Sequence, residues 1–310
     1  MKTQSILDQM ILVVVKIAIW QGRKTVKMRD LVHNGIDVDK LPPESLAALG
    51  SKRIISPDKV KIFKTLRRDA MRLCRKNGVR FTGDSYAVPQ GKVEAISQEL
   101  MRIKGEFESA KTNFISVYEE EVEKWIDSNP VEWSPIIRAS MESPSRINKS
   151  MSFNFAVLDV KAPEGLGDNG LDEEVNNLYG QFCQEVRSVA RRAFDKLFVG
   201  KEEISKRKLR PIRLIREKLV GMLFLDPSIA ETIEIIDDTL NRLPEEGTIK
   251  GTDLNMVAGL LGRQLANMGR VVTKEQVGDE DYDDVTEGSV PTEEVVNQNT
   301  GKVEPITWDF

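Results

Sequence analysis

The sequence predicts a mainly α-helical protein with a small β element. Two long stretches, 91–127 and 171–199, carry apolar residues at heptad spacing, which is typical of helices that pack along a continuous seam. Two short β-branched or aromatic runs predict strands. A composition of 40% hydrophobic and 30% charged residues fits an ordered, water-soluble protein rich in helix. We therefore expect a long antiparallel, coiled-coil-like helical hairpin, a short antiparallel sheet and a C-terminal helical bundle.

The first strand is predicted near the N-terminus. Alternating β-branched residues over 13–20, with a turn at Gln21-Gly22 behind them, indicate a strand for which a hairpin with 24–28 is one pairing. An aromatic and β-branched run over 153–160 is the other natural partner, because each run would otherwise be an isolated apolar strand with unpaired backbone groups. We expect 13–20 and 153–160 to pair at one end of the hairpin.

A capped helix should follow the first strand. Ser56 is a good N-cap and precedes a proline and an acid, so the helix should begin there; it should end at Asn77, with Gly78 in a left-handed C-cap. A short helix near 44–49 precedes it, and a strand–turn–strand over 79–88 follows it.

The heptad seams define the two long helices. At 1.5 Å per residue, a helix over 91–127 would be roughly 55 Å long. Neither seam can stay exposed to water, so we expect the two helices to pack on each other, with Phe107 and Phe114 at the centre; a partner chain is the alternative cover. The first seam consists of Val93, Ile96, Leu100, Ile103, Phe107, Ala110, Phe114 and Val117. The second consists of Val175, Tyr179, Phe182, Val186, Val189, Ala193 and Leu197.

The chain therefore divides into four predicted segments. Residues 1–90 hold the first strand and the capped helix, and 91–199 the helical hairpin with a strand excursion at 152–160. Residues 200–269 hold three shorter helices, at about 209–225, 228–243 and 253–268. Residues 270–310 form a disordered acidic tail: from Val271 onward there are 11 acids and 2 bases.

Cysteine usage and hydropathy predict a cytoplasmic protein. Two cysteines, Cys74 and Cys183, lie inside helical patterns and cannot build a disulfide framework or a metal site. The apolar run Met10–Trp20 is far shorter than the roughly 20 residues that a spanning helix needs, and Lys16 interrupts it. The lack of a long apolar run also argues against a membrane-active protein.

Three apparent chemical motifs fail on physical grounds. The glycines Gly165, Gly167 and Gly170 match a dinucleotide fingerprint, but acids crowd the place where a pyrophosphate would bind and no strand completes a βαβ unit. The aspartates that begin at Asp279 lack the glycine and the glutamate of a calcium loop. His33 is the single histidine, so it cannot form a histidine-based metal site, and no serine or cysteine lies in an obvious nucleophile context. We therefore predict no catalytic centre, no metal site and no cofactor, and expect that the protein is not an enzyme.

The densest basic cluster lies at 206–218. A helix would spread its arginines over about half of its circumference, apart from an apolar stripe. The cluster is either a phosphate-binding face or a solvated face that pairs with acids elsewhere; no aromatic residue interleaves it, which argues against base stacking. The candidate phosphate or nucleic-acid contacts are Arg207, Arg210, Arg213 and Arg216.

The C-terminal residues suit a docking peptide. Two aromatic residues stand beside a free carboxylate behind an acidic spacer, although an inert terminus is an equal alternative. The candidate docking residues are Ile306, Trp308, Asp309 and Phe310.

Several segments resemble an uncharacterised family of bacteria and their mobile elements, domain of unknown function 3150. The segments are KIAIWQGRK at 16–24, LGSKR at 49–53, GVRFTG at 78–83 with YAVP at 86–89, and SFNF at 152–155. The resemblance implies no catalytic residues. It does imply a gene that is often encoded beside those of a MoxR-type AAA+ ATPase and a von Willebrand factor A protein, which suggests an adaptor or substrate-recognition part of such a machine.

Two functional hypotheses follow. The first is a non-enzymatic scaffold or adaptor of a phage or mobile-element system, with protein partners such as that AAA+ ATPase. The alternative is a nucleic-acid-associated protein that uses the basic face at 206–218 and an acidic regulatory tail. Nucleic acid and a second copy of the chain are further candidate partners, and a membrane is not.

Overall fold

A computed structural model of the chain describes residues 2–27, 30, 49–161 and 170–270, which belong to one compact unit that ends at Arg270. Three predicted features lie outside the described residues: the short helix near 44–49 (apart from its last residue), the glycine loop before Gly170, and the acidic tail with its docking peptide. His33 and the aspartates that begin at Asp279 also lie outside them.

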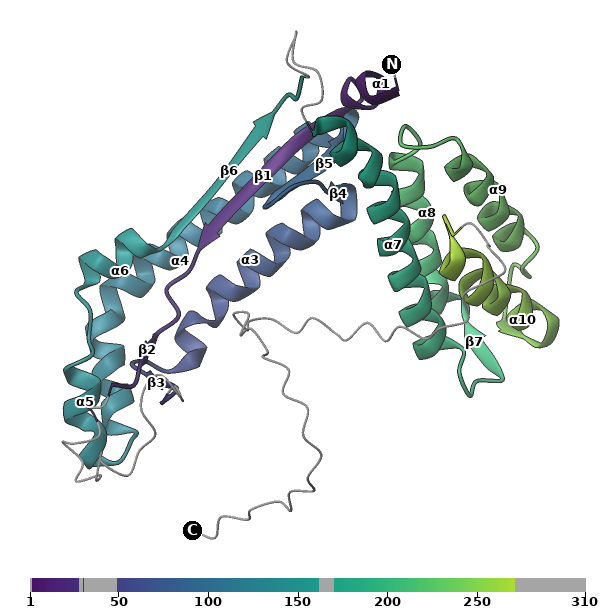
Figure 1. Cartoon of the computed structure of the whole chain (residues 1–310). Coiled ribbons are helices and arrows are strands. Elements are labelled where there is room, and N and C mark those ends of the chain that lie inside the picture. The colour runs from purple at the N-terminus through teal and green to yellow at the C-terminus, as the bar shows by residue number, and fades with distance from the viewer. Residues whose placement is uncertain (1, 28–29, 31–48, 162–169, 271–310) are drawn as a thin grey trace, which may run out of the picture. The chain divides into compact units, whose positions relative to one another are not determined.

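A four-stranded antiparallel sheet lies at the centre of the N-terminal part (Figure 1). Its strands are β1 (Met10–Ala18), β4 (Val79–Arg80), β5 (Ser85–Pro89) and β6 (Ser152–Leu158), in the order β4-β5-β1-β6. The predicted pairing of 13–20 with 153–160 is confirmed, since β1 and β6 pair from Leu12↔Leu158 to Ala18↔Ser152. The predicted strand–turn–strand over 79–88 is also present, as β4 and β5.

The alternative hairpin of 13–20 with 24–28 is wrong. Strand β2 (Arg23–Thr25) pairs instead with β3 (Ser51–Arg53) in a separate two-stranded sheet. The physical reason lies at Trp20, which is buried beside the Tyr118 ring at a centroid distance of 5.6 Å. This contact draws the chain out of the first sheet before β2 begins.

The long helix α4 (Val93–Asp127) packs on α3 (Pro57–Asn77) and on the sheet, and not on the second long helix α7 (Leu171–Leu197) as predicted. The α3 and α4 helices run antiparallel: Lys59 near the start of α3 pairs with Glu121 near the end of α4, at 2.8 Å. The Phe63 and Phe107 rings meet edge to face at a centroid distance of 5.3 Å. A heptad seam shows that a helix needs an apolar partner but does not say which one.

Helix α7 belongs to a second core with the C-terminal helices. It packs on α8 (Arg210–Gly221), and α9 (Ser228–Asn241) and α10 (Gly251–Gly259) complete this core, so the predicted C-terminal helices are confirmed. One position of the predicted seam is wrong: Val189 is exposed, whereas Ala190 is buried. The buried stripe of α7 follows the 3.6-residue helical period more closely than a heptad.

Short elements connect these layers. They are α1 (Lys2–Leu7), α5 (Ser134–Arg138), α6 (Pro144–Ser150), β7 (Glu203–Ser205) paired with β8 (Thr248–Lys250), the 3₁₀ turns Gln90–Lys92, Val131–Trp133, Lys206–Leu209 and Leu265–Asn267, and a π-helical turn Leu260–Gln264. Within the described ranges, no helix has both the length and the apolarity to cross a membrane.

Strand β1 contributes to both cores because its side chains alternate between the two faces of the sheet. Val13 and Val15 lie in the core of α3 and α4, whereas Met10 and Leu12 lie in the core of α7 to α10. The N-terminal strand therefore joins the two cores.

Helix α3 ends differently from the prediction. Gly78 has φ −147° and ψ 177°, which is extended backbone and not a left-handed cap. A side chain at this position would have its Cβ 2.6 Å from the carbonyl oxygen of Ala87 and 2.9 Å from a methyl group of Val88. Glycine is required here for the close approach of β5, not for its freedom at positive φ.

Candidate nucleic-acid interface

Helix α8 separates a buried apolar stripe from a basic face, as its sequence predicts. The stripe is fully inside the second core; its members are Leu209, Ile212, Ile215, Leu219 and Met222. The cations that precede and interrupt it therefore point outward. Arg207, in the 3₁₀ turn before α8, and Arg210 and Arg213, in α8 itself, are exposed.

The fourth predicted contact, Arg216, is engaged within the protein. Its guanidinium forms a bidentate pair with Asp237 of α9, with Nη2 and Oδ2 at 2.6 Å. The hydrogen bond from Arg216 holds the pKa of the Asp237 carboxyl below its usual range. Lys218 forms an ion pair with Glu185 of α7 through its Nζ atom. These two side chains fasten α8 to its neighbours, so the exposed part of the predicted cluster is its N-terminal half.

A second basic face lies on α3. This helix has eight lysines and arginines and two aspartates, a net charge of +6. Its apolar side faces the first core through Phe63, Leu66 and Ala70, among others. Opposite that side, cations recur at steps of three and four residues, which places them on one stripe of the helix. The stripe consists of Lys61, Lys64, Arg68, Arg72 and Arg75, all of them exposed.

Most cations of the two faces have no acidic partner among the described residues. Arg72 of α3 pairs with Asp69 at 2.9 Å, on a strongly exposed part of the helix where an ion pair contributes little. Within the part of the chain that the structure describes, the remaining cations of both faces form no ion pair. They are Lys61, Lys64, Arg68 and Arg75 on α3, and Arg207, Arg210 and Arg213 beside and on α8.

The two basic faces adjoin at the end of α3. Lys76, next to Arg75, has its Nζ atom 4.0 Å from Oε2 of Glu217 in α8, and both side chains are exposed. Arg213 lies one helical turn before Glu217, so about 6 Å separates the bases of the two side chains. Glu217 is thus one acid at the junction of two cationic surfaces.

The α3 stripe was missed by sequence reasoning because the apolar side of that helix gives the more familiar signal. The charged signal was present: cations at 61, 64, 68, 72 and 75 have the same periodicity as the apolar stripe and are displaced from it by about half a turn. The 206–218 cluster was easier to recognise because its cations are adjacent in sequence.

The described residues offer little else that could carry chemistry. Burial raises the pKa of the Cys74 thiol to about 11 and raises that of Cys183, so both thiols are protonated and shielded at neutral pH. No group of three or more histidine, cysteine or acidic side chains among the described residues is placed to hold a metal ion.

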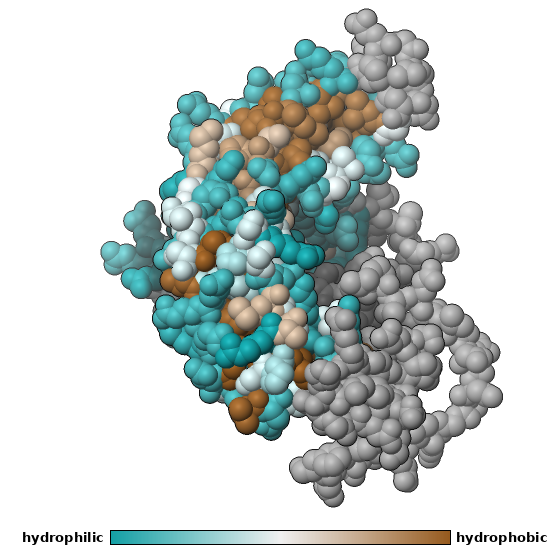
Figure 2. Space-filling model, turned by 90° about the vertical axis from the view of Figure 1, so that its left-hand side faces the viewer, coloured by the Kyte–Doolittle hydropathy of each residue, from teal (hydrophilic) through white to brown (hydrophobic). Residues whose placement is uncertain are grey.

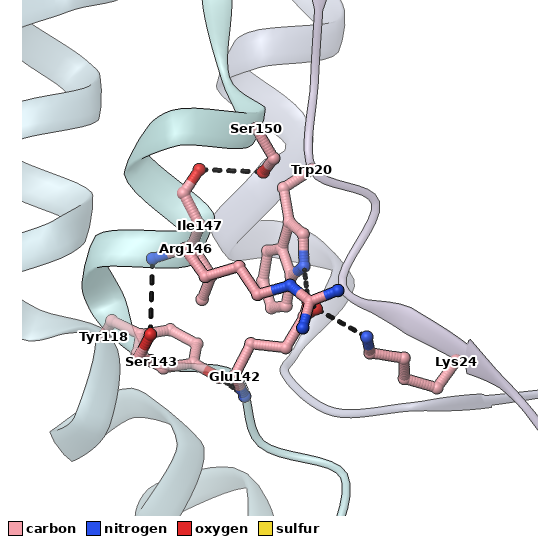
Figure 3. Close-up of polar contacts among 8 residues, drawn as sticks. All are labelled: Trp20, Lys24, Tyr118, Glu142, Ser143, Arg146, Ile147 and Ser150. Carbon is pink, nitrogen blue, oxygen red and sulfur yellow. Dashed lines mark hydrogen bonds and ion pairs between the residues drawn. The ribbon is translucent and has the colours of Figure 1, made fainter.

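A part-buried polar cluster joins the end of β1 to α4 and to the segment before α6 (Figure 3). The Glu142 carboxylate accepts a hydrogen bond from Trp20 Nε1 at 2.7 Å and one from Lys24 Nζ at 2.5 Å. Its backbone N–H donates to the Tyr118 hydroxyl at 3.4 Å. Three segments distant in sequence meet at this one residue, which indicates a structural clamp.

The family match covers most of the chain. The family described as protein of unknown function (DUF3150) matches residues 7–265. The chain belongs to this family. No curated protein and no solved structure matches the chain. The part that matches DUF3150 contains the first core, the two basic faces, the Glu142 clamp and all of the second core except Ile6 and Met268. Residues 271–310 lie outside it.

The Glu142 clamp of this DUF3150 chain should make stability depend on pH. Burial raises the pKa of Glu142, but the hydrogen bonds from Lys24 and Trp20 and nearby positive charge together lower it by more. The net pKa therefore lies below the ordinary value of 4.5. A carboxyl group whose pKa is lower in the folded than in the unfolded state stabilises the fold at pH values above its unfolded pKa. This stabilisation is lost as the pH falls through the folded-state pKa. Glu142→Gln should therefore cost about 1.5–3 kcal/mol at pH 7, the range for hydrogen bonds to a charged group.

Urea unfolding at pH 7 and at pH 3 measures this effect. The difference between wild type and Glu142→Gln should shrink at pH 3, because this pH lies below the ordinary pKa of 4.5 and the carboxyl of the unfolded wild type is protonated there. The matched control Glu132→Gln removes an exposed acid that forms no ion pair within the described ranges, and it should leave stability within about 0.5 kcal/mol at both pH values. A pH-independent cost for Glu142→Gln would contradict the electrostatic origin of the clamp.

Proposed function

We propose that this chain is a nucleic-acid-binding protein without catalytic activity of its own, which holds phosphates on the α3 stripe and on the exposed cations beside and on α8. The observation that carries this proposal is the α3 stripe. Cations with acidic partners stabilise a fold, but four of the five cations in the stripe have none among the described residues. Such a concentration of unpaired charge attracts polyanions.

The dimensions of the stripe fit a nucleic-acid backbone. Lys61 and Arg75 are 14 residues apart, which corresponds to roughly 21 Å along the helix axis. Phosphates of one strand of a duplex recur at about 3.4 Å of axial rise, so the stripe is as long as roughly six base pairs. One phosphate for each cation is compatible with this length.

The chemistry of the two faces favours backbone contacts over base reading. The aromatic residue of α3, Phe63, is buried, and α8 contains none. Base stacking on single strands needs exposed aromatic rings. We therefore expect binding with little sequence preference and a strong dependence on salt, because released counterions drive phosphate binding.

The test measures affinity for a fluorescent 20-base-pair DNA duplex between 50 and 200 mM salt. For the wild type, the logarithm of the association constant should fall linearly with the logarithm of the salt concentration. The quadruple variant Lys61→Gln, Lys64→Gln, Arg68→Gln, Arg75→Gln should bind at least about tenfold more weakly at 50 mM salt. Its slope should be shallower by about 3 to 4, close to 0.9 for each phosphate that the variant no longer neutralises.

A matched control removes four exposed cations from α6, α7 and the turn that follows α7. The control variant carries glutamine at Lys149, Arg191, Lys196 and Lys201. It has the same net charge as the quadruple variant, and its salt slope should stay close to that of the wild type. Equal losses of affinity in the two variants would show a general effect of net charge, and no wild-type binding at 50 mM salt would refute the proposal.

An adaptor function is the second candidate, and one observation favours it. A hollow of about 300 Å³ lies where the end of α8 meets the end of β5, next to the exposed apolar side chains of Val220 and Leu223. Exposed apolar residues beside a hollow are typical of a site for a partner's side chain. The MoxR-type AAA+ ATPase and the von Willebrand factor A protein that the resemblance implies are the partners we propose for this role. The docking peptide at 306–310 also stays a prediction.

A further inference from the structure

Strand β6 lies at the edge of the four-stranded sheet. It pairs with β1 on one side, and no described strand pairs with its other side. An edge strand presents a row of N–H and C=O groups that can pair with another strand of similar length. With seven residues, Ser152–Leu158, β6 is long enough for such pairing.

This edge lacks the features that normally prevent association. Proteins protect exposed edges with charged side chains, proline or bulges. The β6 sequence SFNFAVL has no charged residue and no proline, and its pairing with β1 runs without a bulge from Ser152 to Leu158. The first charges, Asp159 and Lys161, come directly after the strand and pair with each other at 3.6 Å.

Both faces of β6 are apolar at its C-terminal end. Phe153, Phe155 and Val157 point to the α4 side, where the Phe153 ring lies 5.8 Å from the Phe107 ring. Val157 is nevertheless 41% exposed, and Leu158 on the other face is 47% exposed. Figure 2, which views the molecule from the side where β6 lies in Figure 1, shows apolar surface near the top of this face. An apolar edge of this kind costs free energy as long as nothing covers it.

We propose that the edge of β6 binds the β6 strand of a second copy of this chain, antiparallel, about a two-fold axis at Phe155. A two-fold interface requires a surface that complements itself. With the axis at Phe155, Phe153 of each copy lies opposite Val157 of the other, and Asn154 lies opposite Ala156. Aromatic and β-branched residues form favourable cross-strand pairs, and no like charges face each other.

A two-fold axis at Phe155 would also extend the apolar core of α3 and α4 across the interface. The row Val13, Val15 and Ile17 of β1 pairs with Val157, Phe155 and Phe153 of β6 on the α4 side. The second copy would add the same three apolar residues in reverse order, and the two four-stranded sheets would form one sheet of eight strands. This self-complementarity is the reason for choosing a second copy as the occupant, because an unrelated peptide has no fixed register on this edge.

The interface should be weak by itself. A single pair of seven-residue strands buries less than the roughly 1,200 Å² of a standard stable interface. We therefore expect a dimer that dissociates on dilution, with a dissociation constant in the micromolar range. Dimer formation does not depend on the proposed binding of nucleic acid, because the basic faces lie on α3 and α8 and not on β6.

Sedimentation velocity of the full-length chain over about 1–200 μM is the first test. The wild type should shift from monomer to dimer with increasing concentration. Val157→Lys introduces a charge on the exposed edge and should raise the dissociation constant at least about tenfold. The control Val131→Lys adds the same charge at an exposed valine outside the sheet and should not change it. A wild type that stays monomeric at 200 μM overturns the proposal, and so does an unchanged dimer of Val157→Lys.

Disulfide trapping tests the position of the axis. Asn154→Cys and Ala156→Cys are single substitutions on the face opposite α4, and the two native cysteines are buried. An equimolar mixture of the two variants should form a mixed disulfide dimer on mild oxidation, because opposed residues of an antiparallel pair are within disulfide reach. Each variant alone should form little dimer. Efficient trapping of either variant alone, or no trapping in the mixture, overturns the two-fold axis at Phe155.

Discussion

Replacing Phe107 by alanine should lower the free energy of unfolding by about 3–5 kcal/mol, the usual cost of removing a buried aromatic ring. Phe107 is fully buried between α3 and the sheet, with its ring in edge contact with Phe63 and Phe153. Removing the ring would leave a cavity beside both Phe63 and Phe153. These two rings belong to different elements, α3 and β6, and cannot move together to fill it. Urea unfolding followed by far-UV circular dichroism measures the change.

Met101 provides the matched control on the same helix. Its side chain is 62% exposed, so Met101→Ala should change stability by no more than about 0.5 kcal/mol. A cost below about 1 kcal/mol for Phe107→Ala would contradict the packing of α4 between α3 and β6.

Replacing Gly78 by alanine is expected to destabilise the protein by about 1–3 kcal/mol, the range for overpacking. The added Cβ would lie 2.6 Å from the carbonyl oxygen of Ala87. Backbone cannot rotate away as a flexible side chain can, so β5 or the end of α3 would have to move. The thermal unfolding temperature should fall by several degrees.

Gly105→Ala is the opposite case and serves as its control. Gly105 lies within α4, its backbone has no positive φ, and an added Cβ would meet no atom within 4 Å. Alanine loses less backbone entropy than glycine on folding, so this variant should gain about 0.5–1 kcal/mol. The same substitution should therefore have opposite signs at the two sites, and a stabilised Gly78→Ala would show that β5 does not approach α3 as closely as described.

Much of the fold could be predicted because its signals are local. The helix from Pro57 begins with a favourable cap sequence, and the helix to Asp127 has long periodicity. The pairing of β1 with β6 was predictable because the N-terminal part offers few other apolar strands. The partner of α4 was not: several helices carry an apolar stripe of similar width, and the choice of α3 depends on how the sheet orients both helices.

The candidate site was predicted only in part for a similar reason. Adjacent cations at 206–208 are visible in sequence, but the ion pair that engages Arg216 needs Asp237 from another helix. Whether a charge is free depends on tertiary neighbours, which composition and spacing do not specify. The α3 stripe, in contrast, could have been found by applying the helical period to charged residues as well as to apolar ones.

The place of β1 in the sheet has a consequence for synthesis of the chain. Leu12 pairs with Leu158, so the strand that joins the two cores cannot acquire its long partner until about 150 further residues have been made. At a synthesis rate of about 5–20 residues per second, this delay is roughly 7–30 s. During that time β1 presents MILVVVKIA with one edge unpaired, even after β5 has been made. The nascent chain thus has an interval in which a chaperone that recognises extended apolar segments could bind β1 before β6 is available to pair with it.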